Sequence, residues 1–168
     1  VLIGEMRDPE TFQAALQAAE TGHLVLGTVH ASSTFQTMGR ILDLFHADSR
    51  KLIRQSLSFN LQAIVCQKLM PSIAKGVDRV PAVEVLLTNA VVRQLIEEER
   101  DGELLDVIRA HERDGMQSFT RSLLNLIETN FVDPREAYEV APNVDELKMM
   151  MKGITASRTG MLSGRQSS

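Results

Sequence analysis

Two short apolar runs near the start of the chain each end in a residue suited to acid–base chemistry. The run at residues 1–3 is followed by Gly4 and Glu5, and the run at residues 24–29 is followed by His30. An uninterrupted apolar run of this kind is typical of a buried parallel strand. Because ligands of open α/β sheets bind outside the carboxyl ends of the strands, we expect Glu5 and His30 to converge on one crevice.

The residues between these two runs predict a helix. Asp8 is a good N-cap, Pro9 suits the first helical position, and Gly22 supplies a left-handed stop. Apolar residues recur between them at helical spacing: Phe12, Ala15, Leu16 and Ala19. Strand, helix and strand joined by short turns form a right-handed crossover, which places the two strands in parallel.

The order and spacing of these segments resemble those of a known family. Residues 4–8 read GEMRD, residues 19–25 read AETGHLV, and residues 27–30 read GTVH. They resemble the Walker B and His-box segments of the secretion ATPase superfamily, and within it the PilT-like retraction ATPases of type IV pili. Further matches continue to about residue 152. The resemblance implies an α/β fold: the C-terminal part of a RecA-like P-loop ATPase core, with a βαβ unit and a hairpin, followed by a small helical domain.

For such a family, the two segments imply roles in ATP hydrolysis. The reaction needs a polarised water in line with the γ-phosphorus and donor groups on the phosphoryl oxygens. Glu5 can accept the proton of that water, a contribution of about 10²- to 10⁴-fold. His30 can donate to the γ-phosphate, and Thr28 offers a hydroxyl on the same side. Taken alone, Glu5 could simply stabilise the dipole of the following helix; together with the His segment, the catalytic interpretation is the stronger.

Two other residues of the matching segments are candidates for nucleotide-sensing or supporting roles. Arg7 either pairs with Asp8 or reaches the site, and the sequence leaves both possibilities open. His23 precedes the strand that delivers His30, so the two imidazoles lie roughly 20 Å apart at the rise of a strand. A structural role for His23 is therefore at least as well supported. Three further acids have no partner spacing that indicates metal binding or acid–base work: Asp43, Glu84 and Asp106.

Downstream, the pattern predicts two helices and then a hairpin. Ser33 and Asp48 can each cap a helix. The second helix carries basic residues that we expect to be exposed, either as a solvated face or as a subunit contact: Arg50, Lys51 and Arg54. Residues 63–70 and 80–87 have strand character, and the residues between them have turn character.

The remaining residues predict short helices. We expect residues 1–88 to form the C-terminal half of the ATPase core, residues 89–152 a helical domain, and residues 153–168 a disordered tail. The retraction family carries the stretch Ala-Ile-Arg-x-Leu-Ile-Arg-Glu, linked to retraction, in such a domain. Here residues 90–97 read AVVRQLIE; with Arg93 matched to the first arginine, Glu97 stands four residues later in place of the second basic residue. A retraction motor and an accessory paralogue of the PilU kind both remain open.

Composition limits the other possibilities. The 168 residues are 43% hydrophobic and 24% charged, as in an ordinary globular protein. A net charge of -4 gives no reason to expect nucleic acid, whose binders usually carry a basic face. The single cysteine, Cys66, excludes an internal disulfide and the four-thiolate zinc site of related assembly ATPases, and it fits a reducing cytoplasm. No apolar run approaches the roughly 20 residues of a membrane span.

The resemblance implies a parent protein longer than this chain. Val1 lies within an expected strand, and the phosphate loop G-x-x-x-x-G-K-[ST] occurs nowhere in the sequence. We therefore expect a C-terminal piece that by itself neither binds ATP tightly nor hydrolyses it. The implied parent is a homo-hexamer that binds ATP and Mg²⁺ and drives pilus retraction and twitching motility. It would work at the cytoplasmic face of the inner membrane with an integral platform protein and a paralogous retraction ATPase.

Two interpretations from other classes also remain. A non-catalytic module for binding a partner would keep a vestigial sheet, with Glu5 and His30 as relics. A related secretion or DNA-uptake ATPase shares the Walker B and His segments, although the missing basic face disfavours it. A phosphate loop upstream of Glu5 would favour an ATPase, and its absence would favour the module.

Overall fold

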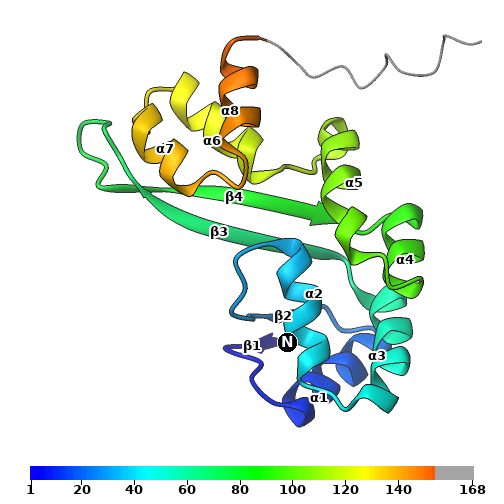
Figure 1. Ribbon diagram of the computed structural model, residues 1–168. Helices are drawn as coiled ribbons and strands as arrows, with labels where there is room; N and C mark the ends of the chain where they lie inside the picture. Colours follow the sequence, from blue (N-terminus) through cyan, green and yellow to red (C-terminus); the bar gives the residue numbers. More distant parts are fainter. Residues whose placement is uncertain (154–168) are drawn as a thin grey trace, which may run out of the picture. The chain divides into compact units, whose positions relative to one another are not determined.

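The structure is a computed structural model, and it describes residues 1–153. Its elements, shown in Figure 1, are β1 (Leu2–Ile3), α1 (Pro9–Glu20), β2 (Leu26–Gly27), α2 (Thr34–Asp43), α3 (Ala47–Asn60), β3 (Ala63–Pro71), β4 (Arg79–Leu87), α4 (Ala90–Glu97), η1 (Asp101–Glu103), α5 (Leu104–Ala110), η2 (Glu112–Asp114), α6 (Phe119–Glu128), α7 (Pro134–Val140) and α8 (Val144–Met151). The expected α/β class is confirmed, while the expected tail lies, from residue 154 onward, outside the described residues.

The described residues form two compact units. The first consists of Val1–Leu69 with Pro81–Ser118, and the second of Met70–Val80 with the residues from Phe119 onward. The division into a core to residue 88 and a helical domain from residue 89 stays a prediction. None of the helices within residues 1–153 is both long and apolar enough to cross a membrane.

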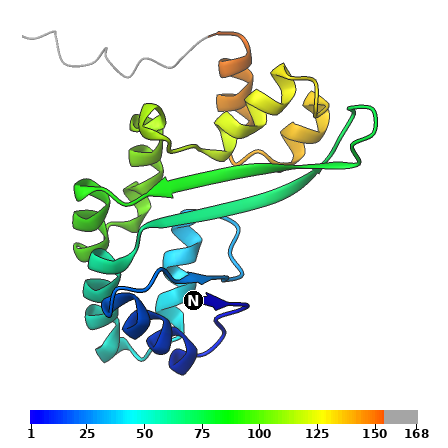
Figure 2. The same ribbon diagram turned by 180° about the vertical axis from the view of Figure 1, so that it is seen from behind.

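The βαβ crossover expected at the start of the first unit is present. β1 pairs in parallel with β2, with Leu2 opposite Leu26 and Ile3 opposite Gly27. The two strands lie side by side when viewed from either side (Figures 1 and 2). The expectation that these strands are buried is wrong, since Leu2 is 79% and Leu26 57% exposed. Within the described residues the sheet holds only these two strands, so much of their apolar surface stays open to solvent.

The helix of the crossover begins and ends where the sequence predicts. The carboxylate of Asp8 accepts hydrogen bonds from the backbone N–H and the hydroxyl of Thr11, at 2.7 and 2.9 Å. Gly22 adopts a φ of +90°, a conformation that favours glycine. The inner face of α1 buries Phe12, whose ring packs edge-on against Phe45 with centroids 5.9 Å apart. The α1 helix is thereby anchored to the core of the first unit.

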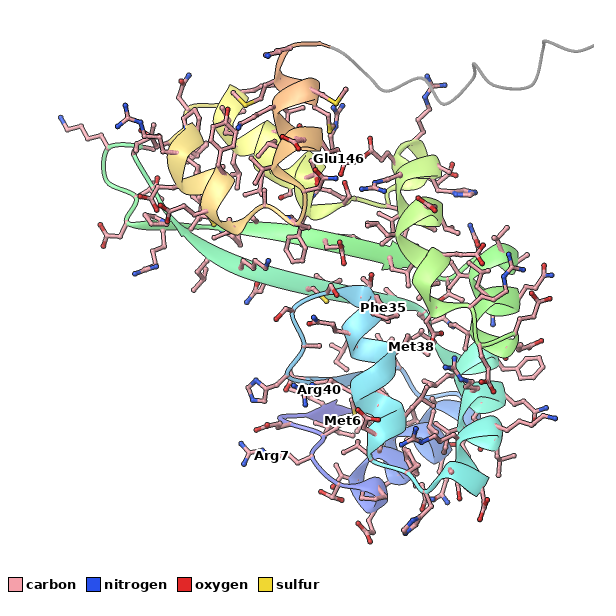
Figure 3. The ribbon with its side chains drawn as sticks, viewed as in Figure 1. Met6, Arg7, Phe35, Met38, Arg40 and Glu146 are labelled. Carbon is pink, nitrogen blue, oxygen red and sulfur yellow. The ribbon has the colours of Figure 1, made fainter. Side chains whose placement is uncertain are left out.

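The α2 helix follows the segment that carries His30. Its N-cap Ser33 accepts a hydrogen bond from the backbone N–H of Gln36 at 3.3 Å. The helix is strongly two-sided, because Met38 is fully buried whereas Phe35 is 54% exposed. Figure 3 labels both side chains on this helix. Burial of Met38 and its apolar neighbours fixes the rotation of α2 in the first unit.

The α3 helix corrects two expectations. Its N-cap is His46 rather than Asp48, so the helix begins at Ala47, two residues earlier than a cap at Asp48 would place it. Arg54, expected on an exposed basic face, is only 8% exposed. Its guanidinium forms a bidentate ion pair with Asp101 at 2.8 and 2.6 Å and also donates to the carbonyl of Ile96 at 3.1 Å. Because these partners accept its hydrogen bonds and neutralise its charge, the Arg54 guanidinium can be buried.

The expected hairpin is formed by β3 and β4, which pair with each other. Burial alternates along both strands. The buried positions of β4 are Val80, Ala82, Glu84 and Leu86, so a carboxylate takes a place in an otherwise apolar row. Period-two alternation is the pattern of a sheet with one covered face.

Two helices of the second unit begin at side-chain N-caps. Asp133 accepts from the backbone N–H of Arg135 at 2.8 Å, and Asn143 accepts from that of Glu146 at 3.0 Å. The α8 helix therefore starts at Val144. The side chain of Glu146 in α8, labelled in Figure 3, accepts a hydrogen bond from the hydroxyl of Thr120 in α6 at 3.5 Å.

Candidate functional site

Glu5 and His30 meet just beyond the carboxyl ends of the two parallel strands. The Nε2 atom of His30 lies 2.9 Å from the Oε1 atom of Glu5. Glu5 follows the end of β1 by two residues and His30 follows the end of β2 by three, so the strand pairing brings them together. The Glu5 side chain is 23% exposed and that of His30 88%, which leaves both within reach of a ligand. The expected convergence is present in the structure.

Backbone bonds hold the two segments that carry these side chains. The N–H of Met6 donates to the carbonyl of Thr28 at 2.9 Å, which prolongs the parallel pairing past the strands. The hydroxyl of Thr28 donates to the carbonyl of Gly4. Thr28 therefore acts in this structure by joining the two segments directly beside Glu5, rather than by presenting a free hydroxyl.

The side chain of Met6 approaches the backbone of Gly27, so a larger residue at position 27 would require the end of the Met6 side chain to move. A Cβ atom placed on Gly27 would lie 2.7 Å from the Cε and 2.9 Å from the Sδ of Met6. A glycine within an apolar strand run is a known sign of such a close contact. In the sequence, the sign is the glycine that interrupts the apolar run of residues 24–29.

Arg7 reaches the site rather than pairing with Asp8, which resolves the alternative left open by the sequence. Its guanidinium donates to the Oε2 atom of Glu5, whereas Asp8 caps α1. The hydrogen bond from Arg7 is the main cause that lowers the pKa of Glu5, and His30 lowers it further, against a smaller opposing effect of burial. The Arg7 side chain is 75% exposed and points away from α2 (Figure 3).

The lowered pKa has a consequence for acid–base work. A carboxylate held by Arg7 is ionised, but it is a weaker base than a free one. Glu5 would become a stronger proton acceptor if Arg7 moved to another anion. The high exposure of Arg7 leaves that movement open.

His23 lies at the other end of β2 from His30. Its Nδ1 atom is 3.1 Å from the carbonyl oxygen of Ala18 and 3.1 Å from the hydroxyl of Thr21. These contacts tie His23 to the C-terminal end of α1. The structure therefore brings Glu5, Arg7 and His30 together, with Thr28 beside them, and keeps His23 apart.

Within residues 1–153, no group of three or more histidine, cysteine, aspartate or glutamate side chains could hold a metal ion. The chemistry that this part of the chain does offer is a carboxylate flanked by a guanidinium and an imidazole.

Glu84, for which the sequence indicated neither metal binding nor acid–base work, is a buried residue in contact with the start of α2. Glu84 of β4 is 3% exposed and accepts hydrogen bonds from Thr34, the first residue of α2. The sign that could have revealed it is its place in the alternation of β4, where Ala82 and Leu86 mark the same buried face. A carboxylate at such a position needs a partner inside the protein.

The stretch on α4 that resembles the retraction-linked motif faces α3. Arg93 donates to the carbonyls of Ser58 and Phe59, the latter at 2.9 Å. Glu97, at the position where the family has a basic residue, accepts from the hydroxyl of Ser58 at 2.7 Å. Both polar positions thus hold the C-terminal end of α3, where helix carbonyls lack partners within the helix.

Comparisons with known proteins agree with this geometry. The family model described as Type II/IV secretion system protein matches residues 1–79, which include the whole candidate site. The chain is 39% identical over 147 residues to a twitching motility protein of Neisseria gonorrhoeae, a match that covers 88% of the chain and 39% of that protein. It is 38% identical over 141 residues to the type IV pilus retraction ATPase PilT of Pseudomonas aeruginosa, with coverage of 84% and 40%.

A solved structure extends the likeness to three dimensions. The crystal structure of the pilus retraction motor PilT with bound ADP superposes with a TM-score of 0.77 at 38% sequence identity. The match covers 89% of this chain and 41% of that one. The chain thus spans about two fifths of the length of the curated relatives it matches, at 39% and 40%. Residues 1–79 thus match the type II/IV secretion family, and most of the chain, including its helical part, is similar to PilT-like retraction ATPases.

Proposed function

We propose that this chain is part of an ATPase that couples ATP hydrolysis to retraction of a type IV pilus, and so to twitching motility. The observation that carries the proposal is the 2.9 Å contact between Glu5 and His30 at the carboxyl ends of β1 and β2. This contact lies inside the segment that matches the secretion family. Similarity to a twitching motility protein and to a retraction ATPase supports the biological role.

In the proposed reaction, Glu5 accepts a proton from the water that attacks the γ-phosphorus of ATP. The bond between that phosphorus and the β–γ bridging oxygen breaks, and ADP leaves. General-base catalysis of this kind contributes about 10²- to 10⁴-fold. His30 donates to an oxygen of the γ-phosphate, and Arg7 leaves Glu5 when the anionic substrate arrives. Thr28 keeps the two segments in register throughout.

The longer protein would supply the rest of the nucleotide site. We propose that a phosphate loop and the ligands of Mg²⁺ lie outside the residues described here, since this sequence contains no G-x-x-x-x-G-K-[ST] loop. In this proposal residues 1–88 belong to the ATPase core and residues 89–152 to a helical domain. No step above depends on a metal held by this chain.

We propose the assembly and location on the same basis. The parent forms a homo-hexamer at the cytoplasmic face of the inner membrane. There it acts on an integral platform protein, together with a paralogous retraction ATPase. A ring suits an ATPase with nucleotide between subunits, because a head-to-tail interface can close on itself.

A second candidate is an accessory paralogue of such a motor. It is favoured by Glu97, which accepts from Ser58 at a position where the retraction motif carries a basic residue. An accessory paralogue would hydrolyse ATP but would support retraction only when another retraction ATPase is present.

The experiment that tests the proposed function uses the complete protein and the cells that produce it. We expect Glu5→Gln to lower ATP turnover by about 10²- to 10⁴-fold and to abolish pilus retraction. Glu10→Gln, which alters an exposed acid in the first turn of α1, is the matched control and should leave both unchanged. Full turnover in the Glu5→Gln protein would overturn the proposal, and retraction that depends on a second ATPase gene would select the accessory role.

A further inference from the structure

Glu84 joins the hairpin to the start of α2 by two hydrogen bonds. Its Oε1 atom accepts from the backbone N–H of Thr34 at 2.9 Å and from the Thr34 hydroxyl at 3.0 Å. Glu84 is 3% exposed and Thr34 1% exposed, so water does not compete for these bonds. The partners are 50 positions apart in the sequence, and both belong to the first unit.

The start of α2 is also the end of the segment that carries His30. Only residues 31–33 separate His30 from Thr34. Side-chain hydrogen bonds tie this connection to α2. The N–H of Ser32 donates to the side chain of Gln36 at 3.2 Å, the carbonyl of Ser33 accepts from the Thr37 hydroxyl at 2.9 Å, and the Ser33 hydroxyl accepts from the N–H of Gln36 at 3.3 Å. A displacement of the first turn of α2 would therefore act on Ser32 and Ser33, and Ser32 is only two residues from His30 along the chain.

The type of residue at position 84 argues against simple packing. The other buried residues of β4 are apolar, and an apolar side chain here would avoid the cost of burying a carboxyl group. What Glu84 provides and an apolar residue cannot is an acceptor for an N–H group at a helix start, which has no partner within the helix. A helix N-terminus also favours a carboxylate through its dipole. Glu84 thus binds the first N–H group of α2, in addition to the cap that Ser33 provides.

We propose that Glu84 is a positioning residue, which acts through Thr34 and α2 to hold His30 in contact with Glu5. This inference rests on the proposed function in one respect: Glu84 affects hydrolysis only if Glu5 and His30 take part in it. Glu84 does not touch the substrate. Its effect is on the population of chains in which the imidazole and the carboxylate lie together.

The test uses the 168-residue chain without nucleotide and follows the contact by NMR. In the wild type we expect a nuclear Overhauser effect between the His30 ring and the Glu5 side chain. Glu84→Met should weaken it strongly and accelerate hydrogen exchange at the Thr34 amide by roughly tenfold or more. Glu84→Gln keeps an acceptor oxygen and should restore both readouts, whereas Thr34→Val removes the hydroxyl alone and should give an intermediate loss.

A matched control separates positioning from general loss of stability. Glu97→Met removes another carboxylate that accepts from a hydroxyl, that of Ser58, in the same unit. It should lower the melting temperature without weakening the contact between His30 and Glu5. If Glu84→Met does not fold, the positioning role is tested by comparing the His30–Glu5 contact in Thr34→Val and Glu84→Gln, at temperatures where both variants are folded.

The outcomes distinguish this inference from the proposed function. An unchanged contact in folded Glu84→Met, or in Thr34→Val, would overturn the positioning role, whatever the ATPase assay shows. Normal turnover by the complete Glu5→Gln protein would overturn the proposed function but leave the measured link between Glu84 and His30 standing. A contact that is lost in Glu84→Met and regained in Glu84→Gln supports the inference.

Discussion

The Nε2 atom of His30 and the Oε1 atom of Glu5 lie 2.9 Å apart, on two segments that the pairing of β1 with β2 brings side by side. A third group, the guanidinium of Arg7, holds the other oxygen of the same carboxylate. The site is therefore a carboxylate between two donors. Its protonation, its rigidity and its dependence on distant residues can each be measured.

The first prediction concerns the pKa of Glu5. Arg7→Met removes the main cause of its lowered pKa, so that pKa should rise towards the ordinary value of a glutamate. Because the pKa is lowered in the folded chain, the interaction stabilises the fold above the ordinary pKa, and this stabilisation is lost as the pH falls through the lowered value. The chemical shift of the Glu5 carboxyl carbon, followed against pH, checks this. Arg109→Met should leave the titration of Glu5 unchanged, and an unaltered titration in Arg7→Met would contradict the prediction.

A second prediction concerns the buried pair of Arg54 and Asp101. Asp101→Asn leaves a buried guanidinium without its carboxylate and should lower the free energy of unfolding by about 3–5 kcal/mol. The matched change at an exposed pair, Asp106→Asn beside Arg109, should cost only about 0–1 kcal/mol. Urea unfolding of the 168-residue chain measures both. Equal losses would show that Arg54 is no more dependent on its partner than a surface arginine.

A third prediction concerns the thiol of Cys66. Burial is the main cause that raises its pKa; the hydrogen bond with the Thr37 hydroxyl lowers the pKa, and the charge of Glu84 raises it by a smaller amount. Since the thiolate is the reactive form, alkylation of the folded chain should be slower than that of the urea-unfolded chain by on the order of tenfold or more. The reaction with iodoacetamide, read by mass spectrometry, gives both rates. Equal rates would place the thiol at the surface.

A fourth prediction concerns the chain without the rest of its proposed parent. It contains no phosphate loop, whose backbone donors and lysine supply much of the binding of ATP. The purified 168-residue chain should therefore neither bind ATP tightly nor release phosphate from it. Calorimetric titration with ATP and a phosphate-release assay check the two parts of this statement. Turnover that disappears in Glu5→Gln would show that the chain is sufficient by itself.

The local parts of this fold could be predicted from local sequence. Asp8 and Ser33 are N-caps in the structure as their residue types predict, and Gly22 provides the left-handed stop after α1. The parallel pairing of β1 with β2 also followed from a strand–helix–strand pattern with short turns. Since both strands end at one edge, the meeting of Glu5 and His30 needed no further information.

The parts that could not be predicted depend on pairs far apart in the chain. From the sequence, Arg54 was expected at the surface with Arg50 and Lys51. Its partner Asp101 lies 47 positions away in the chain. Glu84 and Thr34 are 50 positions apart, and neither residue type at its own position indicates the other. Such pairs are set by the packing of helices and strands, about which spacing along the sequence says nothing. The exposure of Leu2 was missed for a similar reason, because an apolar run does not show how many strands its sheet contains.

The measurement that tests the central claim most directly is a double-mutant cycle on Glu5 and His30 in the complete protein, with ATP turnover as the readout. If the two residues act on one step as a unit, Glu5→Gln should lower kcat by about 10²- to 10⁴-fold, and adding His30→Gln to it should cost little more. His30→Gln alone should also cause a clear loss. If instead the losses of the two single variants multiply in the double variant, the residues act independently, and the account of a shared hydrolytic site would be contradicted.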